Sequence, residues 1–144
     1  MSFKTITISE EIKTTPQNLY KIYLDPQDNL CWNYASEGWT TPFAEIDAKV
    51  GGIFKIGYQS PDRKNDFTFE GKFVEMVENQ KISYKIGDGR PVVITFEQNP
   101  NNPEFTTINL TLALEDENTA EMQRQGWGMI LKHLKDYTEK QVKA

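Results

Sequence analysis

The chain contains 144 residues, of which 38% are hydrophobic and 12% aromatic, and its formal net charge is −5. This length predicts one domain, residues 1–144, that buries about two-thirds of its unfolded surface. The single cysteine and single histidine exclude an intramolecular disulfide and a zinc site built from Cys and His ligands. The acidic excess argues against a nucleic-acid partner, because such binding depends on neutralising phosphates.

The first third of the chain predicts a strand followed by two short helices. Hydrophobic residues alternate over residues 3–13, which is typical of a half-buried strand. Thr15 and Pro16 then provide an N-cap and a first helical residue. A second short helical turn is expected over residues 27–32, and residues 34–45, which show no period, are expected to form a loop.

Alternating strands and one long helix account for the rest of the chain. After Gly51-Gly52, hydrophobic residues alternate in five segments separated by turn residues, at 54–58, 67–73, 82–86, 92–96 and 108–114. Apolar residues then recur at helical spacing over residues 120–140. These patterns predict an α+β fold: a curved antiparallel β-sheet gripping a long C-terminal helix, with two short helices between the first two strands.

The reactive side chains give little support for catalysis. His133 lacks an identifiable nucleophile or orienting carboxylate, and is interpreted as a flank or surface residue. Cys31 has acidic neighbours, which disfavour a thiolate, and is interpreted as a small buried residue. Carboxylate pairs such as Glu45 with Asp47 are better explained as a solvated face. The sequence therefore assigns no catalytic residue, metal ligand or cofactor.

The aromatic residues are more informative. Seven of them are expected on the sheet face that meets the helix carrying Trp127, at positions Phe54, Tyr58, Phe67, Phe69, Phe73, Tyr84 and Phe96. Gly126 and Gly128 flank Trp127 inside the helix, where each costs about 1 kcal/mol relative to Ala and therefore suggests a need for space. The residues alone leave two interpretations open, a filled core and a ligand cavity whose polar groups are Tyr58, Tyr84, Asn109 and Gln125.

Several motifs occur in an order that resembles a known family. They are Asp25-Pro26, Cys31-Trp32, Gly51-Gly52-Ile53-Phe54, Gly71-Lys72-Phe73-Val74-Glu75, Lys81-Ile82-Ser83-Tyr84 and Gly126-Trp127. The pattern is similar to the heat-shock protein 90 ATPase activator homologues, which belong to the START-like, helix-grip superfamily. The resemblance implies a cavity between sheet and C-terminal helix, used in the superfamily for lipids, hormones and polyketides. The eukaryotic activator also has a separate chaperone-binding domain, and from the length of this chain we expect no such domain here.

Three hypotheses follow. The first is a binding protein for an apolar or aromatic small molecule, with a cavity lined by Trp32, Phe54, Ile56, Phe67, Phe69, Tyr84, Phe96, Met122, Gly126, Trp127 and Ile130. The second is a cyclase- or hydrolase-like enzyme that uses a buried carboxylate in the same cavity. The third is an interaction module that binds a chaperone or its own copy through the loop at 39–43 or a sheet edge. We favour the first, and expect a cytoplasmic protein without a membrane span or a signal peptide.

Overall fold

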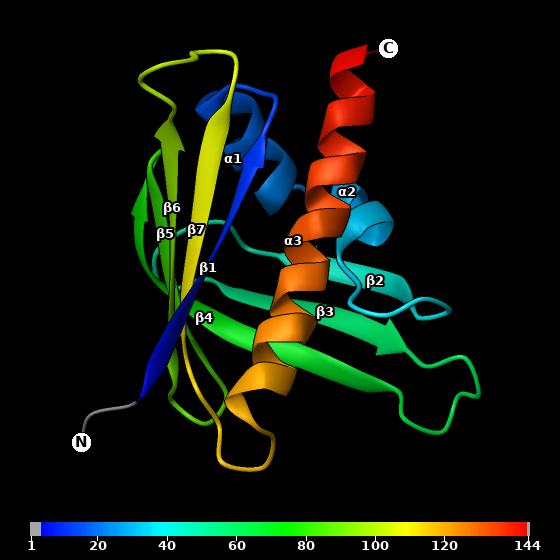
Figure 1. Cartoon of the computed structure of the whole chain (residues 1–144). Coiled ribbons are helices and arrows are strands. Elements are labelled where there is room, and N and C mark those ends of the chain that lie inside the picture. The colour runs from blue at the N-terminus through cyan, green and yellow to red at the C-terminus, as the bar shows by residue number, and fades with distance from the viewer. Residues whose placement is uncertain (1–3, 144) are drawn as a thin grey trace.

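The computed structural model describes residues 4–143, and within them the chain forms seven strands and three helices. Their order is β1 (Thr5–Ile12), α1 (Pro16–Leu24), α2 (Pro26–Trp32), β2 (Thr40–Ile46), β3 (Ile53–Gln59), β4 (Phe67–Val77), β5 (Lys81–Ile86), β6 (Pro91–Gln98), β7 (Thr106–Ala113) and α3 (Ala120–Lys143). The strands form one antiparallel sheet in the order β1-β7-β6-β5-β4-β3-β2. The sheet curves around α3, which crosses its concave face (Figure 1). The predicted helix-grip fold is confirmed.

The prediction was wrong for one element, β2. Residues 34–45 were expected to form a loop, but Thr40–Ile46 pairs with β3 from Thr40 opposite Gln59 to Ile46 opposite Phe54. The pairing register shifts between Thr40 and Phe43, and Pro42 lies within this irregular stretch. Because a bulge and a proline interrupt the alternation, this strand lacks the two-residue period by which the others were found.

The two short helices are confirmed, and one residue connects them. Thr15 caps α1, as predicted, by accepting a hydrogen bond from the amide of Asn18. Asp25 ends α1 and also caps α2, since its Oδ1 accepts from the amide of Asp28 at 3.0 Å. The residue before a proline avoids the α conformation, so Asp25 is extended, as an N-cap must be. The expected first strand started at Phe3, which lies outside the described residues, and β1 begins at Thr5.

Pairing register aligns the hydrophobic residues of the concave face. Ile8 of β1 lies opposite Leu110, Leu110 opposite Ile94, and Ile94 opposite Ile82, which makes a continuous apolar row across four strands. Helix α3 covers this face, with Leu131 and Leu134 at 1% and 0% exposure. A shift of one residue in the strand pairing would turn each of these side chains to the opposite, solvent-facing side of the sheet. Because they are buried under α3, such a shift is costly, and the register is therefore fixed.

Candidate functional site

An open cleft of about 480 Å³ lies between the first half of α3 and the neighbouring strands. Its walls carry five aromatic side chains, Trp39, Tyr58, Phe67, Phe69 and Trp127. Trp39, on the connection before β2, meets Phe67 of β4 edge to face with ring centroids 6.0 Å apart. We call this space the outer cleft.

Polar groups gather at the end of the outer cleft where β7 leads into α3. Gln123, only 8% exposed, holds this connection because its side-chain amide donates to the carbonyls of Glu115 and Asn118 and accepts from the Glu115 amide. Arg90 also lines the cleft, with its Nε 2.6 Å from Asp88 Oδ2. A guanidinium nitrogen of Arg90 donates to the carbonyl of Ala113 at 3.1 Å. The cleft is therefore amphipathic, apolar along its walls and polar at one end.

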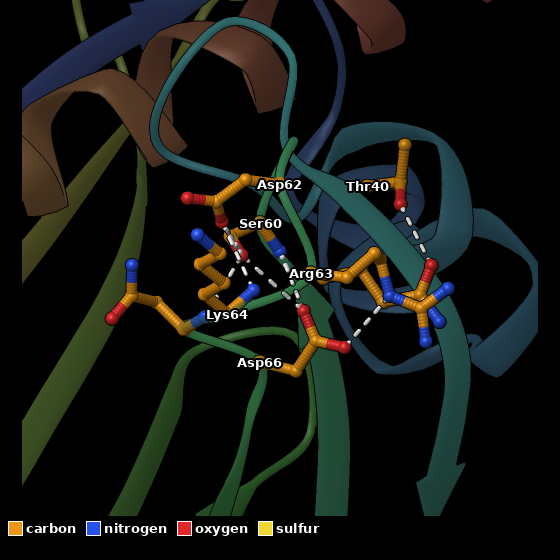
Figure 2. A network of polar contacts seen from close by, with 8 residues as sticks. Thr40, Ser60, Asp62, Arg63, Lys64 and Asp66 are labelled. Atoms are coloured by element: carbon orange, nitrogen blue, oxygen red, sulfur yellow. Dashed lines mark hydrogen bonds and ion pairs between the residues drawn. The ribbon is translucent and has the colours of Figure 1, made fainter.

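The turn between β3 and β4, which precedes Phe67, is held by its own polar network. Figure 2 shows Asp62 accepting from the Ser60 hydroxyl and the Lys64 amide, each at 3.0 Å. Asp66 accepts from the Ser60 amide at 2.9 Å and from Arg63 Nε at 2.8 Å. These hydrogen bonds and the Arg63 charge lower the pKa of Asp66, with the Arg63 bond as the main cause. The network fixes the turn from which β4 starts, and with it the Phe67 side of the cleft.

A second, smaller cavity of about 40 Å³ lies deeper between sheet and helices. We call it the inner cavity. It shares the side chains of Tyr58, Phe69, Trp127 and Ile130 with the outer cleft, so these residues form the wall between the two spaces. Phe69 and Trp127 meet in this wall edge to face with ring centroids 5.7 Å apart. Aromatic side chains thus fill most of the interior around the small inner cavity, and five of them line the outer cleft.

A chain of hydrogen bonds connects α2 to β3 at the inner cavity. The Tyr58 hydroxyl donates to Asn33 Oδ1 at 2.5 Å, and Asn33 Nδ2 donates to Asn29 Oδ1 at 2.9 Å. Asn29 Nδ2 in turn donates to the carbonyls of Tyr23 and Asp25, at 3.0 and 2.8 Å. Asn29 is 2% exposed, and these bonds satisfy a side chain that would otherwise be costly to bury.

Burial is the dominant influence on three tyrosines at the inner cavity. It raises the pKa of Tyr23, Tyr58 and Tyr84 above the usual value of a phenol, so all three are neutral. The neighbouring phenols of Tyr23 and Tyr58 raise the pKa of Tyr84 further. The inner cavity is therefore surrounded by uncharged hydroxyl groups.

The predicted ligand-binding residues divide between the two spaces. Phe67, Met122 and Gly126 line the outer cleft, and Trp32, Phe54, Ile56 and Tyr84 line the inner cavity, while Phe69, Trp127 and Ile130 line both. Phe96 lines neither, because it packs under α1 with its ring centroid 5.6 Å from that of Tyr20 and 6.1 Å from that of Tyr23. Phe67 and Met122 are 53% and 58% exposed, which places them at the mouth of the cleft.

Two of the expected polar groups of the cavity lie elsewhere. Asn109 is on the outer face of the sheet, where it bonds to Ser9 and Thr95, because its strand neighbours Ile108 and Leu110 take the inner face. Gln125 is exposed on α3 and donates to Glu121. The alternation of β7 could have excluded Asn109, but the direction of a glutamine on a helix flank depends on how the helix docks.

The structure also shows where the single cysteine and the single histidine lie. Cys31 was expected to be buried, but it is exposed, since α2 buries Asn29 and Trp32 and turns position 31 outward. His133 ties α3 to the segment after α2: its Nδ1 lies 2.6 Å from the carbonyl of Tyr34, and the two rings stack with centroids 4.0 Å apart.

Several lining residues of the outer cleft were not predicted as ligand-binding residues, although the loop that contains Trp39 was predicted to bind a partner. Trp39 and Ser36 come from the stretch expected to be a loop, and Arg90, Glu115 and Gln123 come from turns and a helix start. Between residues 4 and 143, no group of three or more His, Cys, Asp or Glu side chains could hold a metal ion. No helix of that part of the chain is long and apolar enough to cross a membrane.

Fold and site together define a START-like, helix-grip protein with an amphipathic cleft beside its C-terminal helix. A family model described as activator of Hsp90 ATPase homolog 1-like protein matches residues 13–139, and the chain belongs to this family. The resemblance seen in the sequence is therefore confirmed. No curated protein of similar sequence matches the chain.

Solved structures of relatives have the same fold. A solution structure of an AHSA1-like protein from Aeromonas hydrophila is 29% identical, with a TM-score of 0.83, over 95% of this chain and 94% of that one. A solution structure from Cytophaga hutchinsonii is 32% identical, with a TM-score of 0.80, over 96% and 94% of the two chains. The Aha1 dimer from Colwellia psychrerythraea is 20% identical, with a TM-score of 0.73, over 94% and 96%.

Proposed function

We propose that the protein binds a small apolar or aromatic molecule in the outer cleft. The observation that carries this proposal is the cleft itself, about 480 Å³ of space lined by aromatic and aliphatic side chains. Ligand pockets are commonly about 300–1,000 Å³, mostly apolar, with a few polar groups that orient the ligand. The exposed Phe67 and Met122 at its mouth would lose contact with water when a ligand binds, which favours association.

The form of the cleft suggests how a ligand would lie. Trp39, Phe67 and Trp127 line the cleft, and pairing of an aromatic ligand with such rings adds about 0.5–1.5 kcal/mol per pair to simple burial. Arg90 and Gln123 lie at the polar end, where their own bonds to Asp88, Ala113 and the β7–α3 connection hold them in place. A ligand with one polar end fits this distribution better than a pure hydrocarbon.

Titration with N-phenyl-1-naphthylamine, a neutral aromatic fluorophore, tests the proposal. Its fluorescence should rise on binding, at one molecule per chain, and Trp emission should fall because Trp39 and Trp127 line the cleft. Native mass spectrometry of protein purified without denaturation should show a bound small molecule or its displacement by the probe. Absence of saturable probe binding together with a ligand-free native spectrum would contradict the proposal.

The ionisable groups favour binding over catalysis. The enzyme hypothesis predicts a carboxyl group beside the cavity with a raised pKa. The described carboxyl groups with a resolved shift are Asp62, Asp66 and Asp88, and the pKa of each is lowered. Their oxygens accept hydrogen bonds in exposed turns, which stabilises the charged form that a general acid must avoid.

Self-association is a second proposal, carried by a different surface. Val50, Ile53 and Val74 are 61%, 50% and 42% exposed, and Ile53 and Val74 share the outer face of β3 and β4. The relative from Colwellia psychrerythraea is a dimer. We therefore propose that a second copy of this chain covers these side chains, and that Ile53→Lys shifts sedimentation from dimer to monomer. A wild-type chain that sediments as a monomer at high concentration would contradict this.

The 39–43 loop, expected to bind a chaperone or a second copy, also makes contacts within the chain, although Phe43 is 41% exposed. Trp39 packs on Phe67, and the Phe43 ring covers Gly57 so closely that a Cβ there would lie 2.3 Å from Phe43 Cε1. Pro42 and the irregular register of β2 also protect this edge of the sheet against strand addition. The 39–43 segment therefore supports the cleft better than it supports a protein interface.

A further inference from the structure

The inner cavity contains a buried donor without an acceptor. Trp32 lines this cavity and is 1% exposed, and its Nε1–H has no hydrogen-bond partner among the described residues. An indole nitrogen can only donate, so only an oxygen or another acceptor can satisfy it. A buried polar group left without a partner costs about 1–3 kcal/mol, which makes this position receptive to an acceptor.

The neighbouring polar groups do not supply that acceptor in the described part of the chain. Asn29 Oδ1 accepts from Asn33, and Asn33 Oδ1 accepts from the Tyr58 hydroxyl. The carbonyls of Tyr23 and Asp25 accept from Asn29 Nδ2. The acceptors of this cluster therefore bond to donors of the same cluster. The indole N–H of Trp32 is left without an acceptor among the described residues.

Two tyrosines add further possible donors. Tyr23 and Tyr84 both line the inner cavity. A phenol hydroxyl can donate as well as accept, so either group can supply a second hydrogen bond to an acceptor placed there. The cavity is therefore rich in donors.

Charge and size restrict what could accept these bonds. The residues that line the inner cavity include no Lys, Arg, His, Asp or Glu among those described, so a carboxylate or phosphate would be buried without a counter-charge. A volume of about 40 Å³ holds a group the size of a carbonyl but no aromatic ring. The wall that includes Phe69 and Trp127 separates this space from the much larger outer cleft.

We propose that the inner cavity is the specificity subsite for a neutral oxygen acceptor, a carbonyl of the same molecule whose apolar body occupies the outer cleft. This inference rests on the proposed function and adds the chemical class of the ligand, an aromatic or aliphatic ketone rather than an acid or a hydrocarbon. The carbonyl would enter the inner cavity beside Phe69 and Trp127, which border both spaces, and accept from Trp32 Nε1–H, with the Tyr23 and Tyr84 hydroxyls as further donors.

An isosteric pair of probes tests this. 2-Acetylnaphthalene and 2-isopropenylnaphthalene have nearly the same shape, but only the first carries a carbonyl oxygen. We expect the ketone to bind about fivefold to tenfold more tightly, the effect of one buried hydrogen bond. In a ¹H–¹⁵N spectrum, the indole signal of Trp32, assigned through Trp32→Phe, should move downfield with the ketone and not with the alkene.

The variants give the control. Trp32→Phe keeps an aromatic ring but removes the donor, so it should bring the two affinities close together without weakening the alkene. Tyr84→Phe, which removes one hydroxyl, should reduce the preference partly. Equal affinities and an unmoved Trp32 signal in the wild-type protein would overturn the inference, leave the proposed function standing and indicate an ordered water only. Failure of both probes to bind would overturn both.

Discussion

Replacing Gly126 by leucine should block the outer cleft while strengthening the helix that borders it. Gly126 lies on α3 and lines the cleft, and a Cβ at this position would meet nothing within 4 Å. A leucine side chain would extend the apolar row of Met122 and Ile130, which lie one turn before and after it. The cleft loses space, and the new Cβ itself meets no neighbour.

The expected magnitudes separate the two effects. Leucine is about 0.7 kcal/mol more favourable than glycine in a helix interior, because glycine loses more backbone entropy on folding. For a chain of this length, such a gain corresponds to an increase in Tm of about 2–3 °C. Affinity for N-phenyl-1-naphthylamine should fall at least about tenfold, or 1.4 kcal/mol, since the new side chain occupies the same space.

Gly128→Ala is the matched control. Its Cβ would lie 3.9 Å from Ile8 Cγ2 of β1, an ordinary contact, and the position is not among those that line the cleft. It should stabilise the protein by about 1 kcal/mol and leave probe affinity unchanged. Scanning calorimetry and fluorescence titration measure both quantities. If Gly126→Leu binds the probe as tightly as the wild type, the outer cleft is not the binding site.

Three further perturbations test the rest of the structure. The pKa values of Tyr23, Tyr58 and Tyr84 are raised by folding, so their stabilising effect is complete below pH 10 and is lost as the pH rises further, because the unfolded tyrosines then release their protons. Urea unfolding between pH 9 and 11 should show that the free energy of unfolding falls by up to about 4 kcal/mol per pH unit above pH 10. This fall should be about a third smaller in Tyr84→Phe. A free energy of unfolding that does not change with pH would refute the burial of these hydroxyls. Asp25→Ala should cost about 1 kcal/mol of unfolding free energy through loss of the α2 cap, whereas Asp25→Asn, which keeps an acceptor, should cost much less. Asp66→Ala should make hydrogen exchange at the Ser60 amide severalfold faster with little change in Tm, and unchanged exchange would show that the turn does not depend on this carboxylate.

Local sequence patterns were sufficient to predict an element where a residue type has a single structural consequence. Thr15 before Pro16 predicted the start of α1, and alternation predicted every strand that buries one face, such as β7 with its inward Ile108 and Leu110. The same reasoning failed at β2, where a proline and a shifted register remove the period although the strand pairs along most of β3. A strand of this kind is defined by its partner, which a local pattern does not contain.

The candidate site shows the same division. The aromatic residues and Gly126-Trp127 directed attention to the space between sheet and α3, and most of them border one of the two cavities. Phe96 shared their inward direction but lies under α1, because the strand continues beyond the region that the cleft reaches. Periodicity assigns a side chain to a face of the sheet, while its position along that face depends on the docking of helices.

The sequence by itself determined the fold class and the family, and excluded an intramolecular disulfide and a zinc site built from Cys and His ligands, because these depend on residue types, periods and local caps. Only the tertiary structure decided that the aromatic side chains fill the deep interior and leave an amphipathic cleft at its edge. It also decided that Trp32, one of three tryptophans, keeps a buried N–H without a partner among residues 4–143. Both outcomes depend on which groups from distant segments come within a few ångströms, and that is settled by packing.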